Sequence, residues 1–401
     1  MIVSTNHTLL MACIALALGM LAVKHTKFLR NNHIPEAVVG GFIVATILFF
    51  VNKLTDYTFK FDTSLQSLLM ITFFSSIGLS SDFSKLLKGG KPLLILVFIV
   101  TILIITQNIV GIGMAMLMNE DPFIGLIAGS ITLSGGHGNA GAWGPILEQK
   151  YGVAGALELA MACATLGLVI GGLMGGPIAR HLIKKVKVPK VTQEDTQTTE
   201  DTAKASNTLA DMNTKSVIET VFMLSICIVV GSYVGDLLKD TVFYLPTFVW
   251  CLFVGIFLRN TLNLLFKKPV NDKSIDVLGS TALSIYLAIA LMSLNFSQLA
   301  NMAGPVLLII IVQTIVMALF ACFITFKLMG KDYDAVVISA GHCGFGMGAT
   351  PTAIANMQTV TKTFGPSHKA FLIVPMVGGF IIDISNSIFI KFFINIIEKI
   401  T

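Results

Sequence analysis

Charged residues are scarce in this 401-residue chain: Asp, Glu, Lys and Arg make up only 12%, against roughly 25% in an ordinary soluble protein. Apolar residues make up 54%. A water-soluble fold of this size could not hide so much apolar surface, because it still needs a polar exterior. Several apolar runs exceed the roughly 18 residues that indicate a membrane-spanning helix. The composition therefore excludes a soluble globular domain and predicts an all-α polytopic membrane protein.

The sequence also lacks the motifs of common catalytic and nucleotide-binding sites. It contains no G-x-S-x-G, no P-loop lysine and no H-E-x-x-H, so neither an enzyme nor ATP-driven transport is indicated. None of the six cysteines forms a C-x-x-C pair, which argues against a metal site or a disulfide framework. No cofactor is expected. The net charge of +5 does not indicate a nucleic-acid partner, because the basic residues form short clusters between apolar runs.

One long hydrophilic stretch, residues 184–215, separates two apolar halves, 1–183 and 216–401. This stretch has almost no large apolar residues, so it cannot bury enough surface to order itself and is predicted to be a flexible linker. Each half is predicted to cross the membrane five times. The predicted spans are 7–23, 36–52, 66–80, 92–118, 154–182, 217–238, 245–261, 275–294, 305–329 and 369–397.

The distribution of Lys and Arg orients these spans. With the N-terminus outside, 21 of the 27 basic residues lie on the inner side and six on the outer side, as the positive-inside rule requires. Both termini then lie on the outer side of the membrane and the linker lies on the inner, cytoplasmic side. Because five is odd, the second half begins on the opposite side. The halves are therefore predicted to be inverted repeats, a pattern typical of transporters.

The strongest local signal is a polar, glycine-rich stretch in each half. Residues 130–142 contain Gly135-Gly136-His137-Gly138, and residues 339–352 contain Gly341-His342-Cys343-Gly344. Non-helical backbone at membrane depth survives only where it is buried in protein or lines a wet cavity. Both stretches are therefore predicted to form tips of re-entrant hairpins, the first entering from outside and the second from inside. The alternative is that these glycines let membrane helices pack closely.

A broken helix offers a plausible chemistry for such tips. The break leaves N–H groups at one new helix end and carbonyls at the other. The N–H end carries partial positive charge and can hold a carboxylate. The carbonyl end, with Ser, Thr and Asn oxygens nearby, can hold a small cation. Two tips that meet near the membrane midplane would form a site for an anionic solute and its coupling cation.

Several polar residues at membrane depth are further candidates. His137 and His342 hold corresponding places in the two stretches, either as proton carriers, substrate donors or metal ligands, or as neutral residues that fix the loops. Asp383 lies within an apolar run, where an ionisable side chain is costly and usually functional. Asn386 shares its helix face, so the pair could bind sodium, unless Asp383 is simply a wetted helix-end residue.

Amide side chains interrupt the long apolar helices that follow the proline in each half. They are Gln107 and Asn108 in the first half and Gln313 in the second. Such residues either line a transport path or form hydrogen bonds between helices. The sequence leaves both roles open.

Several strings in the sequence resemble the bacterial sodium/glutamate symporter family. They are residues 34–36 with Gly40 and Gly41, 107–108 with 111–115, 129–138, 160–165 and 341–348. The resemblance covers nearly the whole chain except the linker. It implies sodium-coupled transport of L-glutamate by two inverted five-helix repeats, each with a re-entrant loop. It also implies a homodimer in which a transport domain, holding both re-entrant stretches, slides against a fixed dimerisation domain.

On this interpretation the glycine-rich tips bind glutamate and oxygen-bearing side chains bind sodium. The candidate substrate-binding residues are Ser134, Gly135, Gly136, His137, Gly138, Gly341, His342, Gly344, Thr350, Thr352 and Asp383; the candidate sodium ligands are Asn139, Asp383 and Asn386. Two alternatives stay open. One is a cation-coupled carrier of another small carboxylate, such as a di- or tricarboxylate. The other is an intramembrane enzyme or channel that uses His137 and His342.

Overall fold

The computed structural model is almost entirely helical. It describes residues 2–31, 34–55, 59–62, 64–186, 213–238, 241, 245–266, 270–292 and 296–400. Each of the ten predicted spans falls on helix within this part of the chain. Residues 187–212 of the predicted linker lie outside the described residues, so its flexibility stays a prediction.

The first half begins with a short strand and contains four long helices before the first glycine-rich stretch. Its elements are β1 (Ile2–Val3), α1 (Thr5–His25), α2 (Lys27–Asn31), α3 (Glu36–Thr55), β2 (Lys60–Phe61), α4 (Ser64–Ser80), α5 (Phe83–Leu117), α6 (Pro122–Leu126), the π-helical η1 (Ile127–Ile131), α7 (Gly136–Tyr151) and α8 (Ala156–Ile183). Strands β1 and β2 pair in parallel, with Ile2 opposite Lys60.

The second half has the same sequence of long and short helices. Its elements are α10 (Thr214–Leu237), α11 (Thr247–Thr261), η2 (Leu262–Phe266), α12 (Asp272–Met292), α13 (Phe296–Phe320), η3 (Ala321–Thr325), α14 (Phe326–Leu328), α15 (Tyr333–Gly346), α16 (Thr350–Phe364), α17 (His368–Met376), η4 (Val377–Ile381) and α18 (Ile382–Ile400). In both halves a pair of short helices stands between the fourth and fifth long segments.

Among the described residues, eight helices are long and apolar enough to cross a membrane. A ninth span is obtained when α17, η4 and α18, which bend by 41°, are taken together. Helix α4 is equally apolar but has only 17 residues. The prediction of a polytopic, all-α membrane protein is therefore confirmed.

The chain folds into two compact units that do not follow the two sequence halves. Unit 1 contains Met1–Asp82, His137–Ala162 and Asn213–Gly304, and unit 2 contains Phe83–Gly136, Cys163–Met212 and Pro305–Thr401. Each unit therefore combines helices from both halves. The glycine-rich turn of the first half and the whole glycine-rich stretch of the second half belong to unit 2.

Close backbone crossings hold unit 1 together. Helices α1 and α3 lie side by side, and a Cβ added at Gly40 would collide with the carbonyl of Ala15. A Cβ at Gly19 would collide in the same way with the carbonyl of Glu36. Glycine is required here because dispersion between closely packed helices, rather than the hydrophobic effect, drives association inside a bilayer.

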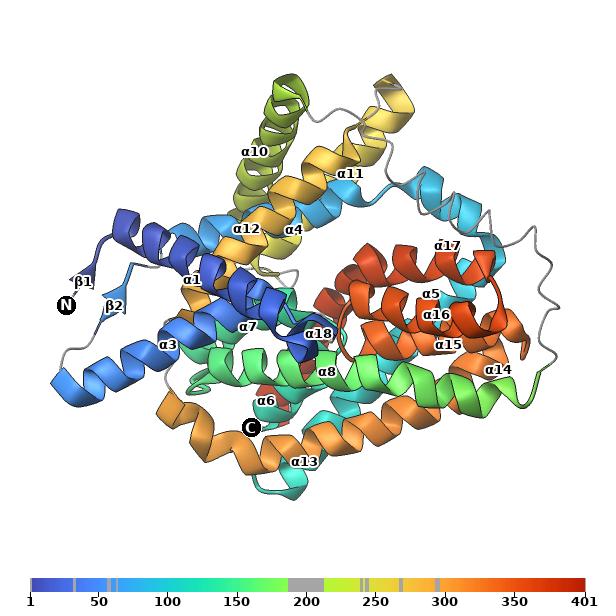
Figure 1. Cartoon of the computed structure of the whole chain (residues 1–401). Coiled ribbons are helices and arrows are strands. Elements are labelled where there is room, and N and C mark those ends of the chain that lie inside the picture. The colour runs from blue at the N-terminus through green and yellow to red at the C-terminus, as the bar shows by residue number, and fades with distance from the viewer. Residues whose placement is uncertain are drawn as a thin grey trace. The chain divides into compact units, whose positions relative to one another are not determined.

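Unit 2 has its own apolar core, built around the C-terminal short helices. Helices α15, α16 and α17 pack against one another (Figure 1), and side chains of α5 such as Leu96, Ile99 and Leu103 are fully buried in the same cluster. This core encloses the polar residues that form the candidate site.

Candidate functional site

The first pair of short helices is interrupted by a break in the backbone. Asp121 caps α6 by accepting a hydrogen bond from the Phe123 N–H at 2.9 Å, and Pro122 occupies the first turn. Within η1 the backbone leaves the helix at Gly129, with φ −99° and ψ −136°. A turn over residues 132–135 follows, and Gly136, with φ +59°, opens α7. A break was predicted here, but it lies upstream of His137.

Side chains of two long helices satisfy the backbone groups that the break releases. The Ser130 N–H donates to Asn108 Oδ1 at 2.9 Å, and the Ser130 carbonyl accepts from Asn386 Nδ2 at 2.8 Å. Asn108 lies in α5 and Asn386 in α18, and both are fully buried. The side-chain amides of Asn108 and Asn386 therefore bind both the N–H and the carbonyl of Ser130 in the broken helix.

Gln107 connects the two glycine-rich stretches. Its Nε2 donates to the carbonyl of Gly346, the last residue of α15, at 2.7 Å, and its Oε1 accepts from the Ser134 hydroxyl at 2.6 Å. The Gln107 carbonyl in turn accepts from Gln313 Nε2 of α13 at 2.7 Å. Gln107 and Gln313 thus form hydrogen bonds between helices, which was one of the two roles that the sequence left open.

Several buried polar atoms of this network have no protein partner. They are Ser130 Oγ, Asn108 Nδ2, Asn386 Oδ1 and Gln313 Oε1. Each buried polar group without a hydrogen bond costs about 1–3 kcal/mol. A group of such atoms on four residues that are otherwise tightly held is therefore suited to bind an ion or a polar solute.

In the second pair of short helices, the turn lies further along the chain than the predicted break at residues 341–344. Asp332 caps α15 by accepting from the Ala335 N–H at 2.8 Å. The helix then continues through Gly346, a short turn occupies residues 347–349, and α16 begins at Thr350. The non-helical part of the second stretch is therefore confined to three residues at its end.

Comparison with known proteins identifies the family of this chain. The family model described as sodium/glutamate symporter matches residues 1–366. The chain belongs to the sodium/glutamate symporter family. The sodium/glutamate symporter of Haemophilus influenzae is 50% identical over 389 residues, which cover 97% of this chain and 96% of the relative. That of Escherichia coli is 49% identical over 391 residues, 97% of each chain.

Membership of the symporter family confirms the resemblance read from the sequence. It also confirms that the chain is not an enzyme, because the relatives are named as symporters. Within the described residues no three His, Cys, Asp or Glu side chains form a metal-binding group. In a sodium-coupled symporter, sodium is the coupling ion.

Gly341, His342 and Gly344 of this symporter-family chain lie inside helix α15, so the prediction of broken backbone at these residues is wrong. A Cβ at Gly344 would lie 2.5 Å from the backbone N and Cα of Ala353 in α16. Gly344 therefore allows α15 and α16 to pack closely, which was the alternative role for glycine. Its place in a substrate site stays a prediction.

We expect Gly344→Ala to lower the free energy of unfolding by about 2 kcal/mol, since the added methyl group overpacks the contact between α15 and α16. The matched control is Gly113→Ala in α5, where nothing lies within 4 Å of the added Cβ. That control should unfold at the wild-type temperature or slightly above it. Scanning fluorimetry of the purified variants measures the difference. A changed KM for glutamate with unchanged stability in Gly344→Ala would instead support a binding role.

His342 is enclosed by aromatic side chains in the interior of unit 2. Its Nδ1 forms a hydrogen bond with the Thr325 hydroxyl at 2.9 Å, and the ring lies 4.9 Å from that of Phe345. The side chain has no exposed surface, and Nε2 has no protein partner. These contacts favour the neutral, structural role among the roles predicted for His342.

His137 and His342 do not hold equivalent positions. His137 is the second residue of α7 and follows its turn, whereas His342 precedes the turn at residues 347–349. Aligning the two turns places Pro351, not His342, opposite His137. His137 and Asn139 are both buried and belong to unit 1, while His342 belongs to unit 2. The sequence correspondence failed because glycine occurs both in turns and in packed helices.

The remaining predicted residues lie near the start of α16 and α18. The Thr350 hydroxyl donates to the Gly378 carbonyl at 2.6 Å, while the buried Thr352 hydroxyl has no protein partner. Asp383 is half-buried in the first turn of α18, one turn before Asn386. Within unit 2, Gln107 links Ser134 to Gly346 at the end of α15 through hydrogen bonds. Asn386 is hydrogen-bonded to Ser130.

Three central residues of the network were not predicted as ligands. Gln107 and Asn108 were candidates either for the lining or for hydrogen bonds between helices, and Ser130 was one residue of a longer stretch. The signal that identifies them is a pair of adjacent amides within the apolar helix α5, because a buried amide in an apolar segment requires partners.

Proposed function

We propose that this chain is a secondary active transporter that takes up L-glutamate across the bacterial inner membrane, coupled to sodium entry. The observation that carries the proposal is the buried network on Gln107 and Ser130, which connects the two glycine-rich stretches in a chain whose relatives are named sodium/glutamate symporters. The mechanism needs an anion site and a cation site close together, and broken helices provide both.

The sodium site is proposed to include Asn386 and Asp383 of α18, together with the Ser130 hydroxyl. Asn386 Oδ1 and Ser130 Oγ are buried oxygens without protein partners, and Asn386 Nδ2 already fixes the Ser130 carbonyl. Sodium coordinates oxygen ligands, and unwound backbone supplies them in many transporters. The Asp383 carboxylate would neutralise part of the ion's charge. Asn139 remains a predicted ligand on α7.

The glutamate site is proposed at the turns and at the helix starts that follow them. Gly135, Gly136, His137 and Gly138 surround the start of α7, and Thr350 and Thr352 surround the start of α16. A helix start carries partial positive charge, which attracts carboxylates. Ser134, which is held by Gln107, would add a hydroxyl. Asp383 or turn carbonyls would receive the ammonium group. Gly341, His342 and Gly344 of α15 remain predicted residues of the site.

The short helices are proposed to be re-entrant hairpins that enter from opposite sides of the membrane. The ten residues 122–131 span about 15 Å and the 14 residues of α15 about 21 Å, at 1.5 Å per residue. Both lengths are below the roughly 30 Å of the hydrocarbon core. With ten spans in two inverted repeats, both termini are periplasmic and the linker is cytoplasmic.

Transport is proposed to proceed by an elevator-type movement of unit 2 in a homodimer. Unit 2 contains the entire Gln107 network and α18, so it can carry the proposed sodium ligands Ser130, Asp383 and Asn386 as one body. Unit 1 contains the first three long helices of each half and would form the fixed dimerisation part. The expectation that both re-entrant stretches lie in one unit is met only in part, because α7 groups with unit 1.

Purified protein in sealed vesicles is expected to accumulate labelled L-glutamate when an inward sodium gradient is imposed. The reason is that the solute and the cation occupy linked sites, so that entry of one favours entry of the other. Matched vesicles with potassium or choline in place of sodium serve as the control. Equal uptake in all three would reject sodium coupling. Stronger competition by a di- or tricarboxylate than by unlabelled glutamate would favour the alternative substrate class.

A further inference from the structure

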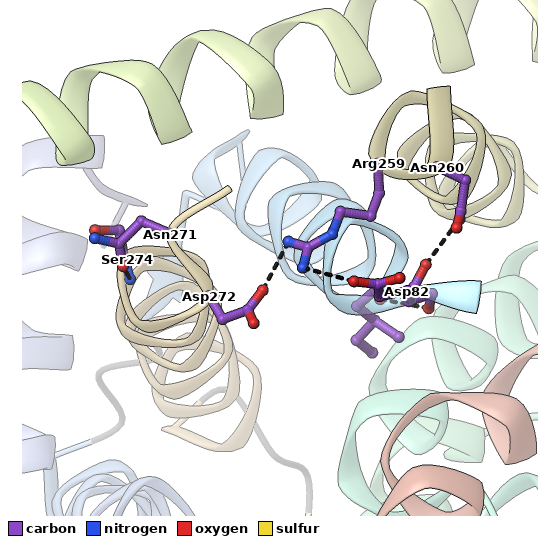
Figure 2. Close-up of polar contacts among 8 residues, drawn as sticks. Asp82, Arg259, Asn260, Asn271, Asp272 and Ser274 are labelled. Carbon is purple, nitrogen blue, oxygen red and sulfur yellow. Dashed lines mark hydrogen bonds and ion pairs between the residues drawn. The ribbon is translucent and has the colours of Figure 1, made fainter. Parts of the chain in front are cut away.

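A buried ion-pair cluster lies in unit 1, outside the proposed transport site (Figure 2). Arg259, in the last turn of α11, is only 3% exposed. Its Nη2 lies 3.3 Å from Asp82 Oδ2, and its Nη1 lies 2.7 Å from Asp272 Oδ1, the first residue of α12. Asp82 is itself 7% exposed, whereas the Asp272 side chain is 42% exposed.

The neighbouring residue strengthens the same attachment. Asn260 Nδ2 donates to the Ser81 carbonyl at 2.9 Å (Figure 2). It also donates to the Ile256 carbonyl in its own helix at 2.8 Å. Two consecutive residues of α11 therefore hold two consecutive residues that follow α4. A guanidinium can serve two carboxylates at once because its donors form a planar fork.

Asp82 lies at the point where the chain passes from unit 1 to unit 2. Asp82 is the last residue of the first segment of unit 1, and the chain enters unit 2 at Phe83. The connecting segment, residues 83–92, starts as helix and then bends at Gly90, where φ is +54° and ψ is −151°. Only glycine adopts this conformation readily. The nearest atom to a Cβ at Gly90 would be Pro92 Cδ at 3.9 Å, so backbone conformation rather than space requires glycine.

We infer that Arg259 and Asp82 form an anchor that fixes the unit 1 end of the connecting segment, so that at this passage of the chain between the units bending during transport is confined to residues 83–92. This inference rests on the proposed elevator movement. Arg259 is accordingly a positioning residue that acts on the rate of transport through Asp82, without touching the substrate. A buried ion pair suits this task because removing one partner leaves the other charge buried and uncompensated, which destabilises the local structure strongly.

The anchor predicts different effects for the two carboxylates that Arg259 contacts. Asp82→Asn should lower the Vmax of sodium-driven glutamate uptake roughly tenfold and leave the KM values for glutamate and sodium within about twofold. The matched control, Asp272→Asn, removes the other carboxylate partner of Arg259 without touching the connecting segment, and it should stay within about twofold of wild type. The Vmax is expressed per transporter molecule in the membrane, so that a loss of folded protein alone would leave it unchanged. Equal Vmax in both variants, or a raised KM in Asp82→Asn, would overturn the inference.

Hydrogen–deuterium exchange in nanodiscs tests the anchor independently of substrate. Amides of residues 83–92 should exchange faster in Asp82→Asn than in Asp272→Asn or wild type, while amides of α11 stay protected. Equal exchange rates of residues 83–92 in all three proteins would overturn the anchor. If wild-type protein shows no sodium-driven glutamate uptake, the proposed function fails, and the exchange result alone decides the anchor. If Asp82→Asn does not reach the membrane, Arg259→Lys replaces it. Lysine keeps the charge but not the fork, so wild-type Vmax and exchange in that variant would overturn the inference.

Discussion

Gln107→Leu is expected to lower sodium-driven glutamate uptake by roughly a hundredfold, a loss that corresponds to about 2.7 kcal/mol. Leucine preserves most of the side-chain volume but removes both hydrogen bonds that Gln107 makes with the two glycine-rich stretches. The Gly346 carbonyl and the Ser134 hydroxyl would then lose their partner in a buried environment. Each such loss costs about 1–3 kcal/mol, which is enough to separate the two stretches by a small displacement. Initial rates of labelled glutamate uptake in vesicles measure the effect.

The control for Gln107→Leu is Thr106→Val, on the adjacent residue of the same helix. The Thr106 hydroxyl donates to the carbonyl of Ile102 in its own helix at 2.8 Å. This hydrogen bond does not connect α5 to another helix. Uptake by this variant should stay within about twofold of wild type. Wild-type rates in Gln107→Leu would show that the network only packs helices together.

Asp383→Asn is expected to abolish sodium-dependent uptake while the protein still reaches the membrane. The substitution retains the shape of the side chain but removes the one negative charge proposed to face the sodium ion. Loss of that charge should weaken apparent sodium affinity by at least roughly a hundredfold, since a half-buried charge pair interacts by several kcal/mol. Uptake measured over a range of sodium concentrations, with protein amount from immunoblots of the membrane fraction, provides the test.

Glu398→Gln is the matched control for Asp383→Asn. Glu398 is an exposed acid near the other end of α18, so its loss removes the same charge from the same helix but far from the network. Its sodium dependence should equal that of wild type. Normal sodium dependence in Asp383→Asn would remove Asp383 from the proposed site and leave Asn386 and Ser130 as the residues to examine.

The long apolar runs predicted the helices well, because a run of that length has few alternatives in a bilayer. Every predicted span coincides with helix in the part of the chain that the structure describes. A break was also predicted from glycine density over residues 130–142. The backbone leaves the helix just before this stretch, at Gly129, and turns within it at residues 132–135. The same argument failed for Gly341 and Gly344, where the helix continues. Glycine permits both a turn and a close helix crossing, and the sequence contains no local signal that separates the two.

The sequence predicted several residues of the candidate site but not their hydrogen-bond partners. Asn386 was identified from its helix spacing with Asp383, but its hydrogen bond to the Ser130 carbonyl joins residues 256 positions apart. Gln107 bonds across 239 positions to Gly346. Such pairings depend on which helices pack together, and a hydropathy pattern carries no information about them.

The sequence by itself therefore determined the class of protein, the helices and the family, because these depend on composition, on runs of apolar residues and on strings that a family shares. Only the tertiary structure decided that residues of both halves combine in each compact unit, that Gln107 joins the two glycine-rich stretches, and that His137 and His342 lie on opposite sides of their turns. The physical reason is that buried polar groups must find partners, and the partner is chosen by the packing of distant helices rather than by neighbours in the chain.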